Sequence, residues 1–266
     1  MTQNINRFIT ALDSDTIGEA YQHKMRIAHA EKESCNRYWE DYDLSIKNST
    51  VREITYKDAK NIIDKYEWIG RMPVCVEHCY GLFFPSKTDN DSELLGGVTV
   101  FSHEYVENQG VWDKYGYTGK IILLARGVNL HFCPKNANSH LIMESIKLLP
   151  EKYKVITCTV DSLAGEVGTI YQACNFDYVG VMRKSKGRNG YLINGKIYSE
   201  RTIRQKYGTQ KQDVIKSLIP DVQIIKQKSK ARYFYFRGDK RTRKQLRSSI
   251  INLIKPYPKR QSINIS

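Results

Sequence analysis

The chain has 266 residues with six cysteines and a net charge of +14, and this length suits one large domain with additions better than two small ones. No apolar run approaches the roughly 18 residues that a membrane span needs, and the N-terminus lacks a signal-peptide layout, so we expect a soluble cytoplasmic protein with reduced thiols and no membrane partner. Cys75 and Cys79 enclose His78 at a loose metal-like spacing, but no second pair of ligands completes a tetrahedral set, so no metal is predicted.

The first half of the chain predicts a helical arm, one helix and a hairpin. Residues 1–48 are rich in charge and are expected to be helical, best over AHAEKESCNRYWEDY. The strand-like run VREITY leads into an amphipathic helix from Asp58 to Tyr66, which Gly70 and Pro73 stop. The runs CYGLFF and LLGGVTVF are separated by the polar segment PSKTDNDSE, which predicts an antiparallel hairpin.

A strand and a helix come next. GKIILLARGVNL predicts an apolar strand, and SHLIMESIKLL after the loop HFCPKNAN predicts a helix. The helix residues expected along one face are Leu141, Ile142, Ser145 and Leu148.

The segment VITCTVDSLAGEVGTIYQACNFDYVG predicts a strand, an acidic turn, a helix and a return strand. It has no charged side chain between Glu166 and Asp177, so it is expected to form an interior wall. Its first strand is near-continuously apolar, and Asp161 ends it. Asp161 and Tyr171 are therefore placed at one end of a buried strand, where α/β proteins keep their sites.

The excess positive charge lies in the last third of the chain. Residues 1–182 hold 19 basic and 24 acidic residues, residues 183–206 hold 8 and 1, and residues 222–266 hold 13 and 1. Clustered Lys and Arg indicate a polyanion as partner, with a solvated basic tail as the alternative. GRNGYLINGK contains two Asn-Gly turns and predicts a hairpin in the basic loop. A helix near 213–218, the strand ARYFYF and the final helix RTRKQLRSSIINLI follow.

This order of elements resembles the GNAT superfamily of N-acetyltransferases. YQACNFDYVG looks like the superfamily's Y-x-x-x-G-F-x-x-x-G element, with Asn175 where glycine is usual. The resemblance implies an α/β (α+β) fold class, with a mixed central sheet flanked by helices, an N-terminal helical arm (1–48), a catalytic domain (49–236, including the basic loop 183–206) and a basic C-terminal helix and tail (237–266). It also places Tyr171 beside the donor's leaving thiol; the alternative for Tyr171 is packing with a satisfied hydroxyl.

The donor loop departs from the GNAT pattern. GNAT enzymes hold the coenzyme A pyrophosphate on a glycine-rich turn before a helix. The segment ARGVNLHFCPKNANSH keeps Arg126 and Gly127 without the remaining glycines. Asn138 or Ser139 can still cap the helix and leave an anion site, while capping alone is the alternative. The residues expected to bind a donor, either acetyl-CoA or another acyl or aminoacyl donor, are Arg126, Gly127, Asn136, Asn138 and Ser139.

A closer resemblance covers roughly residues 56–260. The R-G…P-K-N-A-N-S helix start, the block VDSLAGEVGTIYQACNFDYVG and the ending ARYFYFRGDKR…IKPYPKR are similar to Mom-like phage proteins. That family is named for the bacteriophage Mu protein that modifies adenine in DNA and blocks restriction cleavage, so the resemblance implies a DNA-modifying transferase in a bacterial host and N6-carbamoylmethyl-adenine or a related product. The residues that match its functional positions are Arg126, Ser139, Asp161 and Tyr171.

One departure from that family concerns the pair after the first helix. Mom proteins have His-Tyr there and this chain has Glu67-Trp68, so a role for that histidine does not carry over. An exocyclic adenine amine is a weak nucleophile and must lose a proton as its new bond forms. Asp161 and Glu67 are the available carboxylates, and with Tyr171 they form the predicted catalytic set. The alternatives are an N-cap or turn-forming role for Asp161 ahead of Gly165 and a solvated helix-end charge for Glu67.

A base in double-stranded DNA must flip out to reach such a site, and aromatic side chains can receive it. Four aromatic residues lie in or near loops: Trp68, Trp112, Tyr115 and Tyr117. Each could stack on a base or pack in the core. The side chains predicted to contact DNA are Trp68, Arg71, Arg183, Lys184, Lys186 and Arg188 beside the site, and Lys240, Arg241, Arg243, Lys244 and Arg247 farther along the backbone.

Two other functions remain as alternatives. A catalytically inactive GNAT-like module that binds DNA fits the missing glycine turn and the missing His-Tyr pair. A GNAT transferase that acts on a protein, a small amine or RNA would use the basic tail only for localisation.

Overall fold

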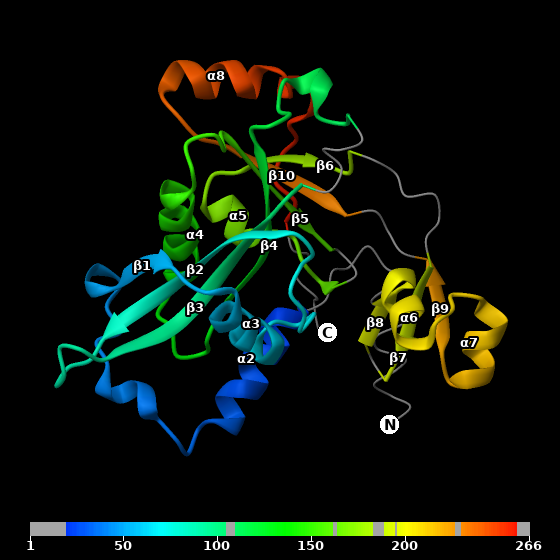
Figure 1. The fold of residues 1–266 in the computed structure, drawn as a ribbon, viewed down its shortest axis with the longest axis horizontal. Helices are drawn as coiled ribbons and strands as arrows, with labels where there is room; N and C mark the ends of the chain where they lie inside the picture. Colours follow the sequence, from blue (N-terminus) through cyan, green and yellow to red (C-terminus); the bar gives the residue numbers. More distant parts are fainter. Residues whose placement is uncertain are drawn as a thin grey trace, which may run out of the picture.

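A computed structural model describes residues 20–104, 110–161, 164–182, 189–194, 196–226 and 230–259. The predicted DNA contacts Arg183, Lys184, Lys186 and Arg188 lie outside these ranges, as do residues 1–19 of the predicted arm. A seven-stranded mixed sheet forms the centre of the fold (Figure 1). In sheet order its strands are β1 (Thr50–Glu53), β2 (Val76–Pro85), β3 (Glu93–Ser102), β4 (Ile121–Asn129), β5 (Val155–Val160), β10 (Ala231–Phe236) and β6 (Asp177–Gly180).

Among the described strands of this sheet, β4 and β5 are parallel neighbours and the other neighbours run antiparallel. The predicted hairpin over β2 and β3 is confirmed. The predicted late strand, β10, inserts between β5 and β6. The predicted fold class, a mixed sheet flanked by helices, is confirmed.

The helices around the sheet are α2 (Tyr21–Lys32), α3 (Tyr56–Tyr66), α4 (Ala137–Leu148), α5 (Thr169–Ala173) and α8 (Lys240–Ser248), with short 3-10 turns at Tyr38–Asp41, Ile46–Asn48, Asp113–Tyr115 and Ile251–Leu253. Val98 of β3 shares a hydrophobic cluster with Ile63 of α3. The neighbouring Thr99 hydroxyl instead lies 2.8 Å from the Ser145 hydroxyl of α4. Because successive side chains of a strand point to opposite faces, α3 and α4 cover opposite faces of the sheet.

The core face predicted for α4 is largely confirmed. Leu141, Ile142 and Ser145 are buried, whereas the prediction is wrong for Leu148, which is 49% exposed. The helix ends at Leu148 and the chain turns there, so Leu149 is buried in its place.

A second, smaller sheet lies apart from the first (Figure 1, right). Its order is β8 (Lys196–Ser199), β7 (Asn189–Ile193) and β9 (Gln223–Lys226), accompanied by α6 (Glu200–Tyr207) and α7 (Gln212–Leu218). The hairpin predicted from the Asn-Gly turns is confirmed as β7 and β8. The segment expected to be a basic loop thus continues into α6, and together with α7 it forms a hydrophobic cluster around Tyr191, Ile203 and Ile215.

The C-terminal segment is bonded to the edge of the large sheet. The Lys255 amide donates to the Tyr178 carbonyl at 2.8 Å, and the Tyr257 hydroxyl donates to the Phe176 carbonyl at 2.8 Å. The Asp239 carboxylate caps α8 by accepting from the Thr242 amide at 2.7 Å. Among the described residues, no helix is both long and apolar enough to cross a membrane.

The N-terminal arm is helical over a shorter stretch than the sequence predicts. α2 ends at Lys32, and turns and a 3-10 turn at Tyr38–Asp41 replace the rest of the predicted helix. No residue of α2 is fully buried, so apolar packing alone does not explain its position.

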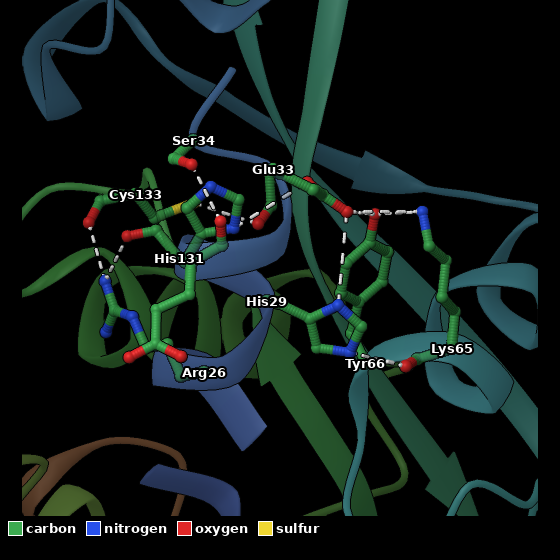
Figure 2. Close-up of polar contacts among 10 residues, drawn as sticks. Arg26, His29, Glu33, Ser34, Lys65, Tyr66, His131 and Cys133 are labelled. Carbon is green, nitrogen blue, oxygen red and sulfur yellow. Dashed lines mark hydrogen bonds and ion pairs between the residues drawn. The ribbon is translucent and has the colours of Figure 1, made fainter. Parts of the chain in front are cut away.

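A polar cluster holds α2 against the fold (Figure 2). The Arg26 guanidinium donates to the carbonyls of His131 and Cys133 at 3.0 and 2.9 Å. The Glu33 carboxylate accepts from the Tyr66 hydroxyl at 3.0 Å, and Lys65 Nζ lies 3.4 Å from it. α2 is therefore bonded both to the end of α3 and to the segment that joins β4 to α4.

His131 is a poorly solvated titratable group of this cluster. Its ring is 6% exposed and its Nδ1 lies 3.8 Å from Glu33 Oε2. Neither ring nitrogen has a hydrogen-bond partner within the described ranges. Burial lowers the pKa of His131 against the opposing charge of Glu33, and His29 and Arg26 lower it further.

We expect this buried histidine to make stability depend on pH. A pKa lower in the folded than in the unfolded chain means that the unfolded chain binds more protons, so the free energy of unfolding should fall as pH drops below the ordinary histidine value of 6.5. Chemical denaturation at successive pH values measures this slope. In His131→Phe the slope between about pH 7 and 5 should be shallower, because the other groups titrate in both proteins; an equal slope would contradict the assignment.

Candidate active site at the ends of β4 and β5

The parallel pair β4–β5 opens after three residues. Its register runs only from Ile121 with Val155 to Leu123 with Thr157, although β4 continues to Asn129 and β5 to Val160. Beyond that point β4 stays paired with β3, and β5 with β10. The β3–β4 register shifts where Arg126 faces Val100 and Leu124 faces Phe101, so Ala125 is an extra residue that bends β4. The two strands therefore diverge beyond Leu123 and Thr157.

Asp161 follows β5 directly. Its carbonyl accepts from the amides of Ala164 and Glu166 at 3.0 and 3.2 Å. Asp161 therefore does form a turn, as the alternative interpretation of this residue predicts. Its carboxylate is 18% exposed and lies 3.3 Å from Lys230 Nζ. The side chain therefore remains partly accessible while the backbone is fixed.

Glu166 is a site carboxylate that the sequence analysis missed. Its Oε1 accepts from the Trp68 indole at 3.1 Å and its Oε2 from the Asp161 amide at 2.9 Å. Burial raises the pKa of Glu166, which hydrogen bonds from Asp161 and Trp68 and the charge of Lys230 partly offset. The available signal was a single carboxylate in an otherwise uncharged, glycine-rich run.

Glu67 lies at the end of α3 and is 5% exposed, so the alternative of a solvated helix-end charge is wrong. Its Oε2 accepts from the amides of Ile69 and Gly70 at 2.9 and 3.0 Å, and lies 4.0 Å from Arg126 Nε. Burial raises the pKa of Glu67 against the opposing effect of Arg126 and of these amides. The charge of Glu166 also contributes to this increase, which places the two carboxylates near one another.

Tyr171 projects from α5 into the core. Its ring lies 5.5 Å from that of Phe176 and 5.7 Å from that of Tyr233, and burial followed by the nearby Cys158 raises its pKa well above the usual range. The hydroxyl is therefore neutral at physiological pH. Two left-handed residues set this helix. Gly168 starts it at φ 76, where a Cβ would come within 2.7 Å of the Tyr233 ring, and Asn175, which takes the place of the usual glycine, has φ 58.

The predicted donor-binding residues lie along β4 and at the start of α4. Arg126 Nε donates to the Arg71 carbonyl at 3.1 Å, and Gly127 is exposed on β4. The residue at the N-cap of α4 is Asn136, with φ 71 and no capping bond from its side chain, so the expectation that Asn138 or Ser139 caps the helix is wrong. Ser139 Oγ instead donates to the Asn136 carbonyl at 2.9 Å, and Asn138 Oδ1 is buried without a partner among the described residues.

The predicted DNA contacts fall into separate groups. Trp68 and Arg71 lie at the opening, where Trp68 is held by Glu166 and by the edge-on ring of Tyr21 at 5.5 Å. Trp112 and Tyr117 are 1% and 0% exposed, so they are core residues. On α8 the exposed basic residues are Lys240, Arg241, Arg243, Lys244 and Arg247. Arg247 forms two hydrogen bonds of 2.7 Å with Asp177.

Within the residues that the structure describes, no three His, Cys, Asp or Glu side chains are grouped so that they could hold a metal ion. What the opening does gather is three carboxylates, two basic side chains and an indole: Asp161, Glu166, Glu67, Arg126, Lys230 and Trp68. Such an arrangement can accept a proton in a partly dry site.

The Trp68–Glu166 bond makes indole fluorescence a reporter of this site. The emission of Trp68 is the difference between the fluorescence of the native chain and that of Trp68→Phe. Because burial raises the pKa of Glu166 above 4.5, we expect this difference to change with pH with a midpoint above that value. The titration should disappear in Glu166→Gln and persist in Glu31→Gln, a matched change at an exposed position of α2. A midpoint at or below 4.5, or a titration that survives in Glu166→Gln, would contradict the raised pKa.

The fold and the site together define a mixed α/β protein with buried carboxylates where the parallel pair β4–β5 opens. The chain belongs to the Mom protein family, whose family model matches residues 48–259, and the predicted Mom-like resemblance is confirmed. A curated relative, the methylcarbamoylase mom of Escherichia phage Mu, is 29% identical over 130 residues, which cover 47% of this chain and 51% of that protein. The match thus spans about half the length of that relative.

Solved structures give a more distant likeness. Arabidopsis thaliana NAA60 in complex with acetyl-CoA has a TM-score of 0.42 and 14% identity, covering 71% of this chain and 98% of that chain. The spermidine N-acetyltransferase of Vibrio cholerae has a TM-score of 0.38 and 11% identity, covering 71% and 94%.

Proposed function

We propose that this protein is a group-transfer enzyme that modifies DNA, attaching a small acyl or carbamoylmethyl-type group to the exocyclic amine of adenine and so protecting the DNA from restriction. Membership of the Mom family over residues 48–259 carries the proposal. The name of the phage Mu relative, a methylcarbamoylase, supports a transfer of this kind. The carboxylates at the β4–β5 opening supply the groups that such a reaction needs.

In the proposed step, the adenine amine attacks the electrophilic carbon of the donor, a C–N bond forms, and the leaving group departs with the electron pair of the bond that breaks. The amine must lose a proton as it attacks. Asp161 is the proposed base, since its carboxylate is 18% exposed and lies beside Lys230. Glu166 and Glu67 hold the surrounding turns through hydrogen bonds with backbone amides. Tyr171, whose hydroxyl carries its proton at physiological pH, is the residue proposed to protonate the leaving group.

The start of α4 fits an anionic donor such as acetyl-CoA or another acyl or aminoacyl donor. The Asn136 side chain makes no capping bond, while the Ala137 amide donates to the Pro134 carbonyl at 3.2 Å and the Asn138 amide, in the Asn129 orientation that satisfies both of its side-chain atoms, donates to the Asn129 side-chain oxygen at 3.0 Å. The positive end of the helix dipole favours a negatively charged group at this position. Arg126, Gly127, Asn136, Asn138 and Ser139 are thus the proposed donor-binding residues. A bound donor would supply the electrophilic carbon and the leaving group.

Double-stranded DNA is the proposed partner, with the target base flipped out to reach the opening. Lys240, Arg241, Arg243 and Lys244 lie exposed on α8 and suit phosphate contacts. Arg247 is paired with Asp177, so its contribution should be smaller. Arg71 lies at the opening, where its carbonyl accepts a hydrogen bond from Arg126 Nε.

Mass spectrometry of digested DNA from cells that express the protein tests the activity. We expect a modified adenine nucleoside with the native chain and a decrease of about 100-fold or more with Asp161→Asn, because a general base contributes roughly that factor. Asp213→Asn, at an exposed position of α7, is the matched control and should behave as the native chain. If the native chain yields no new nucleoside in a host that supplies the donor, the transferase proposal fails, and DNA binding that persists would favour the inactive binding module.

Salt dependence tests the basic surface of α8. Replacing Lys240, Arg241, Arg243 and Lys244 by Ala should weaken DNA binding and flatten the plot of log affinity against log salt, by about 0.9 for each phosphate that the variant no longer neutralises. Replacement of the exposed Lys57 and Lys60 of α3 is the control, and thermal denaturation checks the fold. An unchanged salt slope would show that α8 does not contact DNA.

A further inference from the structure

We propose that helix α2 is part of the active site, and that Gln22 and Tyr21 are positioning residues for the turn that carries Glu67 and Trp68. α2 precedes the segment that the Mom family model matches, which begins at residue 48. The inference rests on the proposed function, because it assigns α2 a part in that reaction.

Gln22 holds this turn through its side-chain amide. Its Nε2 donates to the Tyr66 carbonyl at 2.9 Å, and its Oε1 accepts from the Trp68 amide at 3.0 Å. These two backbone groups stand on either side of Glu67. A primary amide supplies one donor and one acceptor side by side, so the bridge needs glutamine or asparagine chemistry. Glu67 itself binds the amides of Ile69 and Gly70, so the turn is held from both sides.

Tyr21 extends the contact to β5. Its ring meets the Trp68 indole edge-on, with centroids 5.5 Å apart at 69°. The indole donates to Glu166, which also receives the Asp161 amide. Burial and the Asp161 carboxylate raise the pKa of Tyr21, so its hydroxyl is neutral and lies near the proposed base. Side chains therefore link α2 to the end of β5 without a break.

The position of α2 is set by polar contacts along one face. Gln22, Arg26, His29 and Glu33 recur at helical spacing, and each bonds or contacts another part of the fold. Their partners lie at the end of α3 and in the β4–α4 connection (Figure 2). Both of those segments lead into the site, one to Glu67 and the other to the start of α4. Directional bonds of this kind fix a helix in one register. Apolar packing would not fix α2 in this way, because none of its residues is buried.

The test uses the full chain with Gln22→Met, which keeps the side-chain length and removes both hydrogen bonds. We expect hydrogen–deuterium exchange of the amides in residues 66–70 to rise at least about tenfold, since the turn is then held from one side only. The rate constant kcat for DNA modification should fall by about 10- to 100-fold while KM for DNA changes little, because positioning and not binding is impaired. Glu31→Met, at an exposed position of the same helix, is the control and should change neither quantity.

Tyr21→Ala is the second variant, in case Gln22→Met fails to fold. It leaves the Gln22 bonds in place and removes the ring beside Trp68, so the Trp68 emission should shift to the red and kcat should fall. Unchanged exchange over residues 66–70 in Gln22→Met, or increased exchange with an unchanged kcat, would overturn this inference alone. Absence of any modified nucleoside with the native chain would instead overturn the proposed function.

Discussion

The separation of β4 from β5 is the constraint on which the rest of the structure depends. A strand in the middle of a sheet has two rows of backbone groups to satisfy. β4 satisfies one row through β3 and β5 satisfies one through β10, while the rows that face each other pair only as far as Leu123 and Thr157. Beyond that point the facing backbone groups of β4 and β5 no longer pair with each other. The insertion of β10 beside β5 makes this arrangement possible, because β5 keeps a full partner along its other edge.

The buried acids around the opening have an energetic consequence. A carboxylate removed from water is destabilising unless hydrogen bonds and charges compensate it. Glu67 and Glu166 each receive two N–H donors and still have raised pKa values. If these positions served only to stabilise the fold, apolar side chains would be expected at them. Retained, poorly solvated acids beside a partly accessible Asp161 are a common sign of a functional site.

Local elements were largely predictable from the sequence, for local reasons. The hairpin of β2 and β3, the strand β5 and the hairpin of β7 and β8 follow from apolar runs separated by polar or Asn-Gly turns. Asp161 was identified because a charged residue that ends a buried run marks a strand end. Glu166 was missed because its significance comes from Trp68, nearly one hundred residues away. The caps of α4 were misassigned because the left-handed backbone of Asn136 is not visible in the residue order.

The sequence by itself determined most of the local elements, although not the end of α2 or the helix α6. It also determined the concentration of positive charge in the last third and the resemblance that led to the Mom family, since each of these depends on neighbouring residues or on motif identity. Only the tertiary structure decided which elements are adjacent. It inserted β10 between β5 and β6, placed Trp112 and Tyr117 in the core, and brought α2 against the Glu67–Trp68 turn. The physical reason is that pairing and burial join residues far apart in the chain, and their partners are selected by the packing of the whole fold.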